Sequence, residues 1–160
     1  MRGAALALLA ALASTSAAAL TCDYTSPDTA FDRAALSRSE YTLVLGQAQF
    51  DEKLLPHNRA QPPDSTEIPA RITGRALNTN GFVSPFRRAI TLDARCLGPD
   101  CGTLVAGETY LMFLERRDAG YTLTLDPCAE YVFARPNAET LNHIAACFQL
   151  GGQCAPRRKR

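Results

Sequence analysis

The stretch TYLMFLERRDAGYTLTLD, Thr109–Asp126, is the strongest fold signal in the sequence. It consists of two short segments rich in aromatic and aliphatic side chains, separated by the polar residues RRDA. Segments of this composition predict strands, and a short polar connection followed by glycine predicts a tight turn between them. The stretch therefore predicts a β-hairpin and makes a mainly β fold the starting hypothesis.

Three further segments carry the period of two that is typical of strands. In the first segment Tyr41, Leu43 and Leu45 share one face, and Gly46 gives a long strand a point at which to bend. An Asn-Gly pair at positions 80 and 81 marks the turn region between the second and third segments. The predicted strands are Glu40–Phe50, Glu67–Leu77 and Arg87–Ala94.

The interval LPHNRAQPPDST, Leu55–Thr66, has no periodic apolar face. Its Pro62-Pro63 pair cannot supply backbone donors to a sheet. We therefore expect a long exposed connection between the first and second strands.

Near the C-terminus the period becomes helical, with apolar residues at i, i+3, i+4 and i+7: Leu141, Ile144, Ala145 and Phe148. Pro136 and Asn137 provide a helix start, and the Gly151-Gly152 pair provides a stop. A second short helix is predicted over Phe31–Ser37. Five antiparallel strands, a long middle loop and one packed C-terminal helix predict a partly closed barrel of the OB type, with a two-sheet sandwich as the alternative.

The N-terminal residues 1–19 have the layout of a secretory signal peptide. Arg2 is followed by an Ala/Leu run from Ala4 to Ala13 and then by small residues up to Ala19. Cleavage after Ala19 satisfies the small-x-small rule for signal peptides and would leave Leu20 as the first residue. Cuts after residues 17 or 18 also satisfy this rule. An uncleaved anchor is disfavoured because the apolar run is short and interrupted. The remaining length suits one domain, residues 20–156, followed by a basic tail.

All six cysteines lie beyond the signal peptide, and an even number in an exported chain predicts three disulfides. We therefore expect a secreted or periplasmic protein. No CxxC motif is present, and His57 and His143 form no familiar ligand pattern with the cysteines, so we expect no metal and no cofactor.

The charge distribution is uneven, although the chain without its signal is formally neutral. Removing Arg2 from the 17 basic residues leaves 16 against 16 acidic residues. Four of these positive charges form the tail, residues 157–160, which could touch a polyanion or an anionic membrane surface. Two arginine pairs beside aromatic residues are compatible with polyanion binding: Arg87-Arg88 beside Phe86 and Arg116-Arg117 beside Phe113. The neutral net charge, the export signal and the absence of tryptophan argue against nucleic acid as the ligand. Both phenylalanines are expected in the core.

The order of several motifs is similar to that of the netrin-like module, whose best-known members are the tissue inhibitors of metalloproteinases. The similarity covers roughly residues 20–148 in the order of its features rather than in dense identity. The motifs are TC followed by SPDTAF at Thr21–Phe31, the strand YTLVLGQAQF, CG at Cys101-Gly102, AGETYLMFL, and GYTLTLDPC ending at Cys128.

In that inhibitor family the mature chain begins Cys-x-Cys, and both cysteines are bonded into the barrel so that the terminal amine and carbonyl can chelate a protease's zinc. The resemblance aligns Cys22 with the second family cysteine and Leu20 with the first, so this chain keeps one anchor and lacks the other. Asp32 stands where the family often has another cysteine. The residues expected to contact a partner are Leu20, Thr21, Cys22 and Asp23.

The resemblance, together with local spacing, implies three disulfides, and Cys22 with Cys101 is the main competing pair. The implied pairs are Cys22–Cys128, Cys96–Cys101 and Cys147–Cys154.

The resulting hypothesis is a noncatalytic binding protein with a protein partner, in its most specific form an inhibitor of a zinc metalloprotease. The alternatives are a polyanion-binding or surface-binding OB module and a small structural envelope protein without inhibitory activity. An enzyme is disfavoured: His143 and Cys147 are spaced as a base and a thiolate would be, but Cys147 is expected to be oxidised. Acidic residues around the hairpin are expected to be solvated, namely Glu108, Glu115, Asp118 and Asp126.

Overall fold

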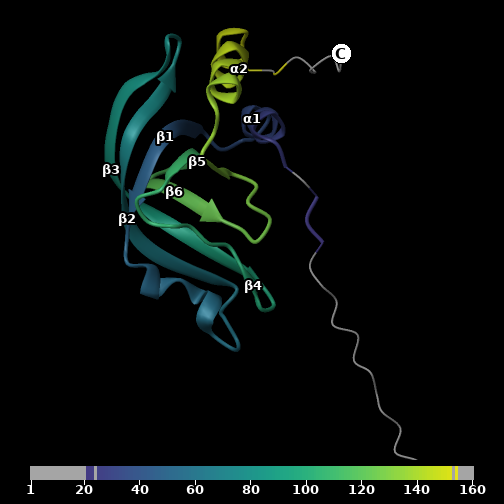
Figure 1. The fold of residues 1–160 in the computed structure, drawn as a ribbon, viewed down its shortest axis with the longest axis vertical. Coiled ribbons are helices and arrows are strands. Elements are labelled where there is room, and N and C mark those ends of the chain that lie inside the picture. The colour runs from purple at the N-terminus through teal and green to yellow at the C-terminus, as the bar shows by residue number, and fades with distance from the viewer. Residues whose placement is uncertain (1–20, 24, 153, 155–160) are drawn as a thin grey trace, which may run out of the picture.

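The computed structural model describes residues 21–23, 25–152 and 154 (Figure 1). The predicted signal peptide, Leu20 and the basic tail lie outside these residues. In chain order the elements are α1 (Pro27–Ala35), β1 (Tyr41–Gln49), η1 (Glu52–Leu54), η2 (Pro56–Asn58), β2 (Ser65–Asn78), β3 (Gly81–Leu97), β4 (Asp100–Cys101), β5 (Thr109–Arg117), β6 (Gly120–Leu125), β7 (Val132–Ala134) and α2 (Ala138–Gln149). The fold is mainly β, with one C-terminal helix, as the sequence predicted. Of the helices in this part of the chain, none is both long and apolar enough to cross a membrane.

Five strands form a closed ring in the order β1-β2-β3-β6-β5, because β5 also pairs with β1. The short strands β4 and β7, which the sequence did not predict, pair with β3 and β5 outside this ring. The prediction that all five strands are antiparallel was wrong, since β3 and β6 run parallel. The reason is geometric: strand direction cannot alternate all the way around a ring with an odd number of members.

The hairpin at Thr109–Asp126 forms as predicted, with β5 and β6 paired at Arg117 and Gly120. The β2–β3 hairpin is longer than expected because its pairing continues to Asn78 and Gly81 at the turn. Its tip reaches beside α2 (Figure 1), where Gln149 donates a side-chain hydrogen bond to the carbonyl of Thr79. The long hairpin therefore connects the ring to the C-terminal helix.

Gly46 and Gly74 face each other where β1 and β2 approach closely. A Cβ atom on Gly46 would lie 2.5 Å from the carbonyl oxygen of Thr73, and one on Gly74 would lie 2.2 Å from that of Leu45. Both distances are shorter than any contact a side chain can make, so this approach requires glycine in both strands. The sequence predicted a bend at Gly46, and the structure gives this glycine another role, the close approach to Gly74.

The connection after β1 is largely exposed, as predicted, with two buried residues as the exception. It contains the 3-10 turns η1 and η2, and its last two residues already belong to β2. Leu55 and Pro56 are buried, and Leu55 is part of the core inside the ring. The burial of Leu55 was not predicted, because the short run Leu54-Leu55-Pro56 gives no periodic signal.

Two hydrophobic clusters share the strand β5. One fills the ring and includes Met112 and Leu114, and the other lies between the outer face of the ring and the helices and includes Leu111 and Phe113. Both faces of β5 are therefore buried, which explains why TYLMFLE is almost continuously apolar. Phe86 and Phe113 are core residues, as expected.

Helix α2 begins after Asn137, whose side chain accepts a hydrogen bond from the backbone N–H of Thr140. Ile144 is fully buried, whereas Phe148 is 41% exposed, so the predicted apolar face is narrower than expected. Helix α1 begins at Pro27, earlier than predicted, because Ser26 caps it. The two helices contact each other over the outer cluster.

Candidate functional site

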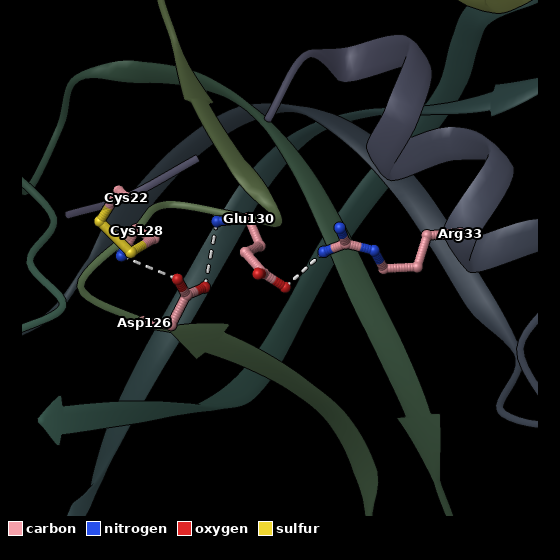
Figure 2. Close-up of a disulfide and its surroundings, with 5 residues drawn as sticks. All are labelled: Cys22, Arg33, Asp126, Cys128 and Glu130. Atoms are coloured by element: carbon pink, nitrogen blue, oxygen red, sulfur yellow. Dashed lines mark hydrogen bonds and ion pairs between the residues drawn. A yellow bond between two sulfur atoms is a disulfide. The ribbon is translucent and has the colours of Figure 1, made fainter. Parts of the chain in front are cut away.

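The N-terminal segment is attached to the ring by the disulfide between Cys22 and Cys128 (Figure 2). Their Cα atoms lie 5.4 Å apart, and 106 positions separate them in the sequence. Thr21, Cys22 and Asp23 are all exposed. Of the predicted partner-binding residues, the structure thus places three together at the surface beside Cys128, and Leu20 lies outside the described residues.

The other two disulfides have short sequence separations. Cys96–Cys101 joins β3 to β4, and Cys147–Cys154 closes the end of α2. All three pairs are those that the resemblance implied. Three disulfides favour an oxidising, extracytoplasmic environment.

The side chains of His143, Cys147 and Cys154 have their ligand atoms within 4.8 Å of one another. Both sulfur atoms belong to one disulfide, and a metal ligand or nucleophile must be a thiolate. In this oxidised form the cluster neither holds a metal as a thiolate site would nor offers a nucleophile.

Asp126 holds the turn that carries Cys128 (Figure 2). Its carboxylate accepts hydrogen bonds from the backbone N–H groups of Cys128, at 2.9 Å, and Glu130, at 3.1 Å. The N–H of Ala129 donates to the backbone carbonyl of Asp126 at 3.1 Å. The prediction that Asp126 is simply solvated was wrong: it fixes the disulfide's position on the ring.

The turn is also connected to α1, because Arg33 and Glu130 form an ion pair (Figure 2). Both side chains are about two-fifths exposed, so the pair adds little stability. Its effect is mainly positional, since it connects the helix that follows the N-terminal segment to the turn that anchors that segment.

A groove of about 510 Å³ runs beside the disulfide, and we refer to it as the N-terminal groove. Its lining combines the N-terminal segment with β7 and the residues on either side of it: Cys22, Asp23, Thr25, Pro27, Cys128, Ala129, Val132, Phe133, Ala134, Arg135, Pro136, Asn137 and Thr140. This lining offers one carboxylate and one guanidinium but neither histidine nor a free thiol.

Two residues of the groove have a strained backbone. Ala129 has φ 51° and Arg135 has φ 45°, and they are the two non-glycine residues with positive φ in the described part of the chain. Such conformations persist where surrounding contacts enforce them. Arg135 is held by its N–H, which donates to the carbonyl of Thr109 at 2.9 Å, and by an ion pair with Glu108 at 2.6 Å.

Glu108 connects this strained position to the core. It accepts a hydrogen bond from the Tyr110 hydroxyl at 2.9 Å, and that hydroxyl accepts one from the N–H of Val105 at 3.2 Å. Burial, the largest cause, raises the pKa of Tyr110, which keeps the hydroxyl protonated as a donor.

Sequence reasoning missed Asp126, Glu108 and Arg135 as parts of the site. Asp126 carried a usable signal, since aspartate two residues before a turn residue commonly accepts its N–H. Arg135 carried none, because only the pairing of β7 brings it to the groove. Comparisons with protein-family models, curated proteins and solved structures find no match to this chain.

Proposed function

We propose that the protein is an exported, noncatalytic binding protein that contacts a protein partner through its N-terminal segment and the N-terminal groove. The observation that carries this proposal is the disulfide from exposed Cys22 to Cys128, which holds Cys22 and Asp23 in the lining of a groove that also contains two residues with positive φ. A covalently held segment loses less conformational freedom on binding than a free terminus would.

The fold supports assignment to the OB type and to the netrin-like module. The ring of five strands, closed by the β1–β5 pairing, matches the strand number of an OB barrel, and a C-terminal helix packs outside it. The CG motif has a structural role, since a Cβ atom on Gly102 would lie 2.0 Å from the carbonyl oxygen of Leu125. The motif thus lets Cys101 and β6 approach closely.

The most specific form of this proposal is inhibition of a zinc metalloprotease by the terminal amine of the mature chain. An α-amine has a pKa near 8, so a fraction is neutral at pH 7 and able to bind zinc. In this chain Cys22 alone anchors the segment, where the inhibitor family has two anchoring cysteines. We therefore expect weaker inhibition than a chain with two anchors would give.

The test begins with N-terminal sequencing and disulfide mapping of the exported protein. The mature protein is then titrated against zinc metalloproteases of several classes with a fluorogenic peptide substrate. One alanine added before the mature N-terminus should abolish inhibition, because it moves the amine away from the zinc. The matched control carries the same alanine after Arg160 and should inhibit like the unmodified protein.

Inhibition that survives the N-terminal alanine would contradict chelation by the amine and leave only a contact role for the groove. A correctly cleaved and correctly bonded protein that inhibits none of the proteases would contradict the inhibitor proposal itself.

A further inference from the structure

Two arginines occupy core-facing positions of the ring. Arg88 lies between Phe86 and Ile90 in the alternation of β3 and pairs with buried Ile72 of β2, so it shares their inner face. By the same argument Arg116, two residues after buried Leu114 and opposite Tyr121, lies on the inner face of β5. A charged side chain on the inner face of a sheet lowers the stability of the fold unless its charge reaches water or an oppositely charged partner.

Both arginines line a cavity of about 770 Å³, which we call the arginine cavity. It lies where β1 and β6 begin and β5 ends, whereas the N-terminal groove lies by the other ends of β5 and β6. Its lining residues are Arg38, Ser39, Glu40, Arg88, Arg116, Arg117, Asp118, Gly120 and Tyr121.

Four guanidinium groups in this lining face two carboxylates. Arg117 is engaged with Glu115, outside the lining, at 2.7 Å. Arg116 approaches Glu40 only to 3.8 Å, and both side chains are mostly exposed. Within the described residues neither Arg38 nor Arg88 pairs with a carboxylate. Among the described residues the lining carries two more guanidinium groups than carboxylates, and Arg38 and Arg88 are the two without a direct ion pair.

We propose that the arginine cavity binds a ligand that presents sulfate or phosphate esters. The planar guanidinium fork matches the tetrahedral oxygens of such groups and can bind them through two hydrogen bonds. Tyr121, whose ring packs edge-to-face on Phe86 at 5.4 Å, is the aromatic residue of the lining. The mouths of closed β-structures are a preferred place for ligand sites. This proposal is independent of the N-terminal groove, because the two sites share no residue.

The test measures binding of two probes to the full mature chain by calorimetry: a heparin hexasaccharide, which carries sulfate esters, and inositol hexakisphosphate, which carries phosphate esters. The Arg88→Gln/Arg116→Gln variant should bind at least about tenfold more weakly than the unmodified protein. The probe that binds more tightly identifies the source of the ester.

The matched control is Arg87→Gln, because Arg87 is exposed like Arg88, adjacent to it in sequence and on the opposite face of β3. Its affinity should stay within about twofold of the unmodified protein, since it removes one positive charge outside the cavity, whereas the single variant Arg88→Gln removes one inside it and should weaken binding by more than that. Unchanged thermal midpoints of the unliganded variants separate lost binding from lost folding. Equal losses for Arg87→Gln and Arg88→Gln would overturn the proposal in favour of diffuse surface charge, and so would no binding of either probe at about 1 mM.

Discussion

The two ends of the five-stranded ring are built from the same strands but are treated in opposite ways. At the end where β6 finishes, Leu55 and Leu104 complete the core and a disulfide anchors the N-terminal segment outside it. At the other end the inner face finishes with Arg88, Arg116 and Tyr121 around an open cavity. Closure of the strand ring therefore does not require both ends to be filled. One end is closed by apolar side chains, and the other is lined by charged side chains.

The largest loss of stability is expected when the disulfide at the end where β6 finishes is removed. Replacing Cys22 and Cys128 by serine releases a loop of 106 residues in the unfolded chain. The chain-entropy model predicts a loss of about 4.8 kcal/mol in the free energy of unfolding. Urea unfolding at neutral pH measures this loss.

The matched control replaces Cys96 and Cys101 by serine. These two cysteines are separated by only 5 residues in the sequence. The same model predicts a loss of only about 2 kcal/mol for so short a loop. Equal losses for the two pairs would show that the long connection does not stabilise the closed end through loop closure.

The next largest effect is expected for Gly102→Ala. Its new Cβ atom would lie 2.0 Å from the carbonyl oxygen of Leu125, so backbone must move at the end of β6. We expect a loss of about 2–3 kcal/mol, measured as a lower midpoint of urea unfolding. Gly98→Ala is the comparison: nothing lies within 4 Å there and φ is +60°, so only backbone strain of about 1 kcal/mol is added. A larger loss at Gly98 would contradict the steric argument.

Asp126→Ala tests whether the carboxylate fixes the turn that carries Cys128. Two backbone N–H groups lose their acceptor, and we expect a loss of about 2 kcal/mol. Asp126→Asn keeps one acceptor oxygen and should lose about half as much. Thermal unfolding of both variants checks this order, and an alanine variant as stable as the unmodified protein would show that the carboxylate does not fix the turn.

At the open end Glu115 should give stability a pH dependence. Hydrogen bonds from the Ser39 hydroxyl, and next from Arg117, lower the pKa of Glu115 from 4.5. A lowered folded pKa means that the stabilisation is present above about pH 4.5 and is lost as pH falls through the folded value. Glu115→Gln should therefore cost about 1 kcal/mol at pH 7 and less at pH 3. A constant difference between pH 3 and pH 7 in urea unfolding would contradict this assignment.

The smallest effect is expected for Arg116→Gln. The side chain is 64% exposed and its contact with Glu40 is long, so the change in unfolding free energy should stay below about 0.5 kcal/mol. A loss of several kcal/mol in urea unfolding would show that the open end is part of the core and would remove the contrast between the two ends.

The sequence predicted elements wherever local pattern decides them. The hairpin at Thr109–Asp126 and the helix capped by Asn137 both form because composition and turn residues agree. The parallel β3–β6 pair and the buried Leu55 could not be read locally, because both result from closing the ring. Arg87 and Arg88 look alike in sequence and are both exposed, and only strand register distinguishes the arginine on the outer face from the one that lines the cavity.

The disulfide connectivity has a consequence for the order in which the protein can be oxidised. Synthesis presents Cys22 first, but its partner follows Cys96 and Cys101, so the pair from 96 to 101 is nested inside the pair from 22 to 128. Oxidation in order of appearance would join Cys22 to Cys96, a bond absent from the native set. Correct pairing thus has to wait until β6 has emerged, or a thiol–disulfide exchange must repair the early bond. We expect the yield of native protein to depend on a disulfide isomerase more strongly than the yield of a chain with consecutive pairs.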